Sequence, residues 1–376
     1  MKIIADDKIP FLRGVMEPYA DIAYRPGAGI TAADVSDADA VFTRTRTKCN
    51  EALLKGSSVK LIATATIGFD HIDTAYCDAA GIRWVNAPGC NSSSVQQYIT
   101  AAIMTLARER ALKLPELTLG VIGVGNVGGK VVRTAEALGM RVLPNDPPRA
   151  EREGASTFVA LDRLLAESDI VTCHVPLAKD GVYRTHHLAS DGFFGKMKPG
   201  AVFINSSRGP VADAEALKRA MQSGRLSACI LDVWEGEPNP DRDLLDSAFI
   251  GTPHIAGYSA DGKANGTAAC IREFCRFFGL DILPDWYPED IPVPPAPMAI
   301  SLDGSGKSNE QIIHEAVAHT YPIREDSDRL KASPETFEEQ RGGYRIRREF
   351  GNFTIRPVNI GEDAVKALRG IGFRIV

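Results

Sequence analysis

Three side chains that could carry out a dehydrogenase reaction each follow a short apolar run: Arg208, Glu237 and His254. A hydride leaves a carbinol carbon only as the hydroxyl proton is lost, so the reaction needs a base that titrates near neutrality, such as His254. Glu237 can orient the imidazole and stabilise its charged form. Arg208 can hold a substrate carboxylate and polarise the carbonyl oxygen. Each residue alone is more typical of a surface ion pair or a structural histidine, so the prediction requires all three to meet.

A glycine-rich turn predicts the hydride acceptor. Gly123, Gly125 and Gly128 form a G-x-G-x-x-G pattern between a predicted strand and a predicted helix. The first glycine permits the tight turn, the second lets the backbone approach a pyrophosphate, and the third allows close packing of helix on strand. The predicted cofactor-binding loop comprises Gly123, Gly125, Asn126, Val127 and Gly128.

Asp146 follows the next predicted strand, residues 141–143. A carboxylate at that position can accept hydrogen bonds from the ribose hydroxyls of the cofactor and repel a 2′-phosphate. Arg149 nearby could favour NADP, but the carboxylate at the strand end should dominate. The sequence therefore predicts NAD as the cofactor.

The elements that position these residues alternate between apolar runs and helical segments. The predicted strands are residues 2–5, 41–43, 61–64, 83–86, 118–123, 141–143, 170–174, 201–205, 228–233 and 249–251. Helices are expected at 95–112, 127–138, 161–166, 213–223 and 262–279. Such alternation is typical of parallel sheets in doubly wound α/β domains. We therefore expect a flavodoxin-like substrate domain and a Rossmann NAD-binding domain, with the active site in the cleft between them.

Six prolines between residues 283 and 297 predict an extended linker, because proline at that density continues neither helix nor central strand. Beyond it, strands are expected at 299–302, 352–356 and 373–376, and helices at 309–319, 335–341 and 363–368. This small α+β module is expected to form a homodimer. The predicted domains are a substrate-binding domain (1–92 and 256–285), a Rossmann domain (93–255) and a C-terminal dimerisation domain (286–376).

Composition narrows the functional classes. The 376 residues include 43 Lys+Arg and 48 Asp+Glu, a formal net charge of -5, which gives no electrostatic case for binding nucleic acid. Neither a membrane-spanning apolar run nor a signal peptide is apparent. Seven scattered cysteines lack zinc spacing, and His186-His187 lacks matched ligands, so no metal is expected. Reduced thiols favour a cytoplasmic enzyme acting on a small molecule.

The motifs GVGNVG, NSSRG, LDVWEGEP and TPHIAGY together resemble those of the D-isomer-specific 2-hydroxyacid dehydrogenase family over about residues 1–280. The resemblance implies that Arg208, Glu237 and His254 are catalytic. It also implies substrate contacts at Thr45, Thr66 and Tyr258. The cofactor contacts that it implies fall on Asp146, Val175, Ser206, Ser207, Asp232 and Gly257.

TATIGFDHID, NAPGCN, DPPRA and the C-terminal module extend the resemblance over essentially the whole chain, to the branch of that family acting on 4-phospho-D-erythronate. The implied reaction is NAD-dependent oxidation of 4-phospho-D-erythronate to (R)-3-hydroxy-2-oxo-4-phosphooxybutanoate in pyridoxal 5′-phosphate (vitamin B6) biosynthesis. Thr45 and Val175 stand where serine and threonine are usual in the family. Thr45 keeps a hydroxyl, whereas Val175 could bind the cofactor only through its backbone.

Cationic side chains must bind the substrate phosphate. Arg44, on the loop after the strand 41–43, is the candidate phosphate-binding residue; the alternative is that this basic loop is simply exposed to solvent. A second cluster, Arg345, Arg347 and Arg348, is more typical of a solvated strand face. Two other functions remain open: a dehydrogenase for another 2-hydroxy acid such as 3-phosphoglycerate or glyoxylate, and a non-catalytic NAD-sensing transcriptional corepressor on the same scaffold.

Overall fold

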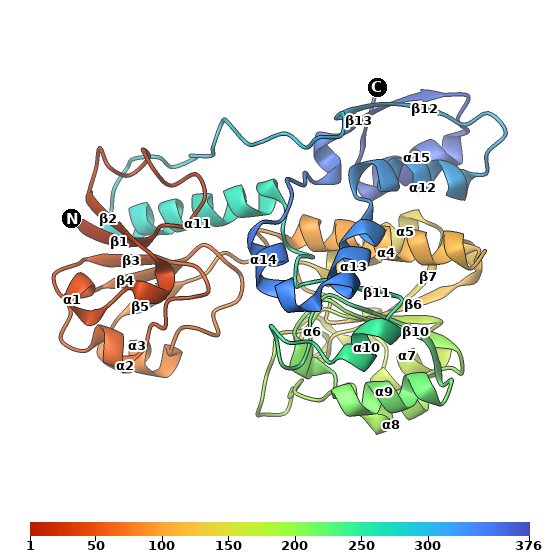
Figure 1. Ribbon diagram of the computed structural model, residues 1–376, viewed down its shortest axis with the longest axis horizontal. Helices are drawn as coiled ribbons and strands as arrows, with labels where there is room; N and C mark the ends of the chain where they lie inside the picture. The colour runs from red at the N-terminus through yellow and green to blue at the C-terminus, as the bar shows by residue number, and fades with distance from the viewer. The chain divides into compact units, whose positions relative to one another are not determined.

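The structure is a computed structural model that describes residues 1–376, except for the side chain of Ala155. The chain folds into two compact units. The first unit contains Met1–Asn91 and Ser259–Pro292, and the second contains Ser92–Tyr258 and Val293–Val376 (Figure 1). Among the described residues, no helix combines the length and the apolarity needed to cross a membrane.

The first unit is built on a five-stranded parallel sheet with the order β2-β1-β3-β4-β5. Its strands are β1 (Lys2–Asp6), β2 (Asp21–Arg25), β3 (Ala40–Thr43), β4 (Leu61–Thr64) and β5 (Arg83–Val85). Its helices are α1 (Ala32–Val35), α2 (Glu51–Leu54), α3 (Thr74–Ala80) and α11 (Ala260–Phe278). The sequence did not predict β2, because that strand is largely half-exposed and lacks a buried apolar run.

Helix α11 follows the Rossmann segment in sequence but belongs to the first unit. Ser259 caps its start, since the hydroxyl accepts a hydrogen bond from the Gly262 amide at 2.8 Å. Gly279 ends it in the left-handed conformation, with φ of 67°. Ile271 and Phe274 are fully buried in the cluster that includes residues of β1, β3 and β4. The helix therefore covers one face of the substrate-domain sheet.

The second unit contains a six-stranded parallel sheet with the order β11-β10-β9-β8-β6-β7. Its strands are β6 (Thr118–Ile122), β7 (Arg141–Asn145), β8 (Ile170–Cys173), β9 (Ala201–Asn205), β10 (Leu226–Leu231) and β11 (Ile250–Gly251). Its helices are α4 (Ser92–Glu109), α5 (Gly128–Ala137), α6 (Pro147–Glu153), α7 (Leu161–Glu167), α8 (Asp191–Lys196), α9 (Ala214–Gln222) and α10 (Arg242–Ser247). The strand order reverses at β6, and such a switch point leaves a crevice at the carboxyl ends of the strands where ligands bind.

The C-terminal segment adds a three-stranded parallel sheet with the order β12-β13-β14. Its elements are β12 (Ala299–Asp303), α12 (Asn309–Thr320), α13 (Ile323–Ala332), α14 (Phe337–Gly342), β13 (Thr354–Val358), α15 (Glu362–Ile371) and β14 (Arg374–Ile375). The sequence did not predict α13, because the interior of that helix is rich in charged side chains. Its buried Ser327 and Asp326 are held by hydrogen bonds, which apolar periodicity does not reveal.

The C-terminal segment and the Rossmann segment share one hydrophobic core. Helices α12 and α15 pack on α4 and α5 (Figure 1). One cluster joins Ile99 and Val131 of the Rossmann helices to Val317 and Leu368 of the C-terminal helices. The sequence treats residues 286–376 as a separate domain, whereas in the structure the part from Val293 onward lies in one compact unit with the Rossmann segment. Shared burial of apolar side chains explains the difference.

Candidate active site

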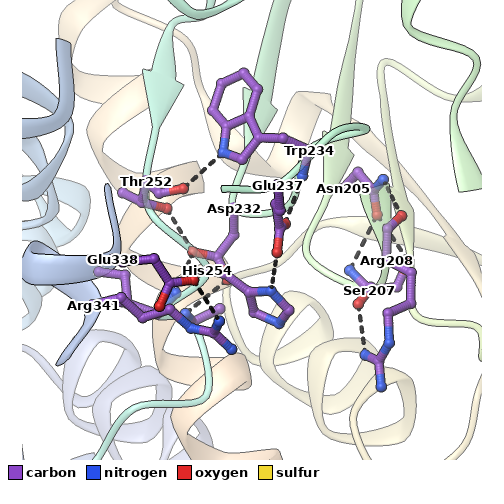
Figure 2. A network of polar contacts seen from close by, with 12 residues as sticks. Asn205, Ser207, Arg208, Asp232, Trp234, Glu237, Thr252, His254, Glu338 and Arg341 are labelled. Carbon is purple, nitrogen blue, oxygen red and sulfur yellow. Dashed lines mark hydrogen bonds and ion pairs between the residues drawn. The ribbon is translucent and has the colours of Figure 1, made fainter. Parts of the chain in front are cut away.

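Glu237 and His254 form a hydrogen-bonded pair at the carboxyl ends of neighbouring strands (Figure 2). The Glu237 Oε2 atom lies 2.8 Å from His254 Nδ1, and Oε1 accepts a hydrogen bond from the Trp234 amide, also at 2.8 Å. Burial alone would raise the pKa of Glu237, but the hydrogen bonds from His254 and Trp234 hold it below its ordinary value. The carboxylate is therefore charged near neutrality and leaves Nε2 of the imidazole for a substrate.

Asp232 fixes the loop that carries His254. Its carboxylate is fully buried and accepts hydrogen bonds from the Thr252 hydroxyl and from the amides of Ile255 and Ala256, at 2.7 to 2.8 Å. Burial raises its pKa to about 6, and these hydrogen bonds and the nearby His254 act in the opposite direction. His254 itself has a φ of 56°, which is uncommon for a residue with a Cβ atom. The structure therefore holds the base in a conformation that an isolated loop would avoid.

Arg208 lies on the loop after β9, beside the loop after β10. Its Nη1 atom donates to the Ser207 carbonyl at 2.9 Å, and its own carbonyl accepts from the Asn205 side chain, also at 2.9 Å. A Cβ atom on Gly209 would stand 2.0 Å from the Trp234 carbonyl oxygen. Only glycine allows the two loops to approach so closely. Because β9, β10 and β11 are neighbours, Arg208, Glu237 and His254 meet at one edge of the sheet (Figure 2).

The glycine turn has the geometry that a dinucleotide requires. Gly123 has a φ of 82°, and a Cβ atom there would lie 2.6 Å from the His174 carbonyl oxygen. A Cβ atom on Gly128 would lie 1.9 Å from the Gly123 carbonyl oxygen. A Cβ atom on Gly125 meets nothing within 4 Å, so space remains at the predicted pyrophosphate position. Asn126 is exposed and Val127 is half-buried at the start of α5.

Asp146 lies where the sequence places it, after β7. Its Oδ2 atom accepts from the Val124 amide at 2.8 Å, and Oδ1 accepts from the Arg149 amide at 3.1 Å, which caps α6. Each carboxylate oxygen keeps capacity for a further donor such as a ribose hydroxyl. Arg149 is paired with Glu153 at 2.6 Å and donates to the Val124 carbonyl. Because the Arg149 guanidinium already has these partners, it gives little support for binding the 2′-phosphate of NADP.

The remaining cofactor predictions cluster around the same edge of the sheet. The Ser206 hydroxyl is buried and has no hydrogen-bond partner among the described residues, which fits a polar ligand that it would contact. The Ser207 hydroxyl donates to the Asn205 side chain at 2.8 Å. Val175 packs beside the glycine turn, with its Cγ1 atom 2.8 Å from the point where a Gly123 Cβ would stand. Gly257 is half-buried on the loop after His254.

The substrate predictions are divided between the units. In the first unit, Thr45 and Thr66 follow the neighbouring strands β3 and β4. Thr64 joins these loops, because its hydroxyl donates to the Arg44 carbonyl at 3.1 Å and lies 2.8 Å from the Thr66 hydroxyl. The Arg44 Nη1 atom donates to the Lys8 carbonyl at 3.2 Å. Tyr258 belongs to the second unit.

Sequence reasoning missed two residues near this site. Glu235 accepts hydrogen bonds from the Ala214 amide and from His187, whose Nε2 atom lies 2.6 Å away, so it ties its loop to the start of α9. The side-chain ligand atoms of His186, His187 and Glu235 lie within 4.8 Å of one another, although Glu235 is distant from the two histidines in sequence.

Arg341, on α14, lies beside the Glu237–His254 pair (Figure 2). A spatial neighbour from a distant element leaves no local sequence signal.

The basic cluster near the C-terminus is not solvated as its sequence suggests, because Arg347 and Arg348 are buried and Arg345 is half-buried. Arg347 is 2% exposed and donates to the carbonyls of Ile255 and Ala256 at 3.1 and 2.6 Å. Its guanidinium carbon lies 4.3 Å from the centre of the Tyr321 ring. Arg345 pairs with Asp326 at 3.2 Å. Arg347 therefore attaches the C-terminal segment to the catalytic loop, whereas Arg345 pairs within the C-terminal segment. Charge periodicity reveals neither contact.

Two protein-family profiles match the chain. Residues 92–256 match the D-isomer specific 2-hydroxyacid dehydrogenase, NAD binding domain. Residues 293–372 match a domain of unknown function. The first match covers the glycine turn, Asp146, Arg208, Glu237 and His254.

Among solved structures, the chain is similar to the Aquifex aeolicus D-lactate dehydrogenase complexed with NAD and lactic acid, with a TM-score of 0.62 and 28% identity over 74% of this chain and 96% of that chain. It is also similar to the NAD⁺-bound 3-phosphoglycerate dehydrogenase of Entamoeba histolytica, with a TM-score of 0.63 and 25% identity over 78% and 99% of the two chains. These likenesses confirm the predicted α/β fold with a Rossmann NAD-binding domain.

Relatives that match over nearly the full length are more specific. The erythronate-4-phosphate dehydrogenase of Bacteroides fragilis is 50% identical over 94% of this chain and 99% of its own. The Klebsiella pneumoniae enzyme of the same name is 37% identical over 100% and 99% of the two chains. The chain belongs to the erythronate-4-phosphate dehydrogenases of the D-isomer specific 2-hydroxyacid dehydrogenase family.

Proposed function

We propose that this chain catalyses the NAD-dependent oxidation of 4-phospho-D-erythronate at carbon 2, a step of vitamin B6 biosynthesis. The observation that carries the proposal is the Glu237–His254 pair at 2.8 Å, on the loops after β10 and β11 of a sheet that has a dinucleotide-binding turn. NAD, when bound, accepts the hydride. The matched relatives share this activity in their names and match both the catalytic and the C-terminal segments.

His254 removes the proton from the substrate hydroxyl through Nε2, because Nδ1 is already bonded to Glu237. The charged carboxylate of Glu237 stabilises the imidazolium that forms. Arg208 binds the substrate carboxylate and stabilises negative charge on the oxygen at carbon 2. Asp232 keeps the loop of His254 in place. These roles require base, orienting acid and anion holder on adjacent loops.

A panel of 2-hydroxy acids tests the activity. With NAD present, we expect kcat/KM for 4-phospho-D-erythronate to exceed kcat/KM for 3-phosphoglycerate and for glycolate, the 2-hydroxy acid formed by reduction of glyoxylate, by about 10²-fold or more. Each polar contact that a substrate cannot make weakens binding of its transition state. A preference for another acid would reassign the substrate. NAD binding without turnover of any acid would favour the non-catalytic corepressor.

Glu237→Gln tests the orienting role. The amide can keep a hydrogen bond to Nδ1 but cannot stabilise the imidazolium by charge. The pKa of Glu237 lies below its ordinary value, so its charge persists through the acid limb of the rate profile. Without that charge the imidazolium loses its proton more readily, and we expect the acid limb of kcat/KM to move to lower pH, with a lower maximum. An unmoved limb would refute the pairing as a catalytic device.

Arg44→Ala tests the phosphate contact proposed for the first unit. A charge-assisted bond to phosphate contributes binding only when the phosphate is present. We expect KM for 4-phospho-D-erythronate to rise about tenfold, with little change for unphosphorylated erythronate. Equal losses for the two substrates would show that Arg44 shapes its loop, to which its Lys8 contact already contributes.

We propose a homodimer formed through the C-terminal sheet. Alternate residues of β12 and β13 are exposed on one face, including Ser301, Arg356 and Val358, while α12 and α15 pack on the opposite side. Because the segment shares its core with the Rossmann helices, a surface substitution is a cleaner test than truncation. We expect sedimentation to show a dimer that Val358→Asp shifts toward monomer. A dimer of unchanged affinity would place the interface elsewhere.

A further inference from the structure

Arg341 has an environment that suits an anion-binding side chain. Its side chain is 18% exposed, and its Nε atom is buried without a hydrogen-bond partner among the described residues. The nearest acidic partner, Glu338, lies 3.8 Å from Nη1, which is beyond hydrogen-bond distance. A guanidinium has five N–H donors, so most of its donor capacity remains available.

The neighbours of Arg341 belong to the catalytic edge of the second unit. Its guanidinium carbon lies 5.6 Å from the centre of the Tyr258 ring, and its charge acts on the Glu237 carboxylate. Tyr258 in turn packs edge-on against Tyr344, with ring centres 6.2 Å apart. Two side chains of the C-terminal segment thus lie against Tyr258, a predicted substrate residue.

This position is fixed by buried contacts. The Tyr344 hydroxyl donates to Asp326 at 2.7 Å. Arg347, three residues further on, donates to the carbonyls of Ile255 and Ala256. The segment that follows α14 is therefore attached directly to the loop of His254. The backbone that carries Arg341 is therefore positioned before a substrate binds, which lowers the entropy cost of binding.

We propose that Arg341 binds the phosphate of the substrate and so gives the C-terminal segment a direct part in substrate selection. Figure 2 shows Arg341 and Arg208 on opposite sides of the His254 imidazole. The reacting carbinol is adjacent to the carboxylate, which Arg208 holds in the proposed mechanism. The rest of the four-carbon chain, which ends in the phosphate, then extends past His254 toward Arg341. Guanidinium groups suit phosphate because two parallel N–H groups match two of its oxygens.

The inference rests on the proposed function, and Arg341→Met tests it. Methionine keeps an unbranched stem and removes the charge. We expect KM for 4-phospho-D-erythronate to rise about tenfold or more, KM for unphosphorylated erythronate to change less than twofold, and inhibition by inorganic phosphate to weaken by a similar factor. Arg341→Lys should restore part of the affinity, since it keeps the charge but not the fork. Arg329→Met, an exposed arginine on the neighbouring α13, is the matched control and should leave all three constants unchanged.

The outcomes separate the inference from the proposed function. If the wild-type protein does not oxidise 4-phospho-D-erythronate, the proposed function fails, and the inference that rests on it is overturned with it. If it does, equal changes in KM for the two substrates, or phosphate inhibition that Arg341→Met leaves intact, overturn the inference. Thermal melting of each variant identifies unfolding, in which case the Arg341→Lys comparison decides: loss of the phosphorylated substrate alone supports the inference, and parallel loss of both overturns it.

Discussion

His254→Ala is expected to lower kcat by about 10²-fold or more while the affinity for NAD stays within about twofold of wild type. General-base catalysis by a positioned imidazole contributes at least that factor. The Nδ1 atom of His254 is bonded to Glu237, and its loop is held by Asp232 and Arg347, so the base is already oriented before substrate binds. Steady-state turnover with saturating NAD, together with calorimetric titration of NAD, measures both quantities.

A histidine elsewhere provides the control for this experiment. His314→Ala, on α12, removes an imidazole that contacts Arg108 and lies outside the proposed site. It should leave kcat unchanged. Turnover by His254→Ala equal to that of wild type would exclude His254 as the base, and a large loss of NAD affinity would instead give it a cofactor role.

The second large effect is expected in the glycine turn, where two alanine substitutions should separate folding from cofactor binding. Gly128→Ala places a Cβ atom 1.9 Å from the Gly123 carbonyl oxygen, a backbone atom that cannot rotate away. We expect it to destabilise the protein by about 1–3 kcal/mol or more, because overpacking forces the backbone to move. NAD affinity should fall with it, since the turn and the start of α5 would both shift.

Gly125→Ala is its counterpart, because a Cβ atom there meets nothing within 4 Å in the chain itself. Stability without NAD should stay within about 0.5 kcal/mol of wild type, as for other surface substitutions. NAD affinity should fall about tenfold or more, because the backbone at this position must approach the pyrophosphate. Thermal melting without NAD and titration with NAD distinguish the two variants. Unchanged NAD affinity in Gly125→Ala would move the pyrophosphate away from this turn.

Much of the fold was predictable from local patterns. The buried strands of both parallel sheets read as apolar runs, since they are covered on both faces, and the glycine turn marks the change from β6 to α5. The half-exposed β2 and the charged α13 escaped prediction, because their burial comes from contacts with distant segments. The extended, proline-rich stretch likewise gives no sign that the residues after it share a core with α4 and α5.

The candidate site divides in the same way. By itself the sequence determined the residue types and their places after strands: the glycine turn, Asp146, Arg208, Glu237 and His254. The grouping of these residues could be predicted because the carboxyl ends of parallel strands lie at one edge of a sheet. The order of the strands along the chain therefore already constrains where the residues lie in space.

Only the tertiary structure decided how those residues are supported. It buried Arg347 among Tyr321 and the carbonyls of the catalytic loop, joined His187 to Glu235, and brought Arg341 of α14 beside Glu237. Each of these contacts joins residues at least 26 positions apart, between elements whose local sequences do not depend on one another. The free energy that fixes them comes from burial of a shared core and from hydrogen bonds that form only after the chain has folded, so no local pattern encodes them.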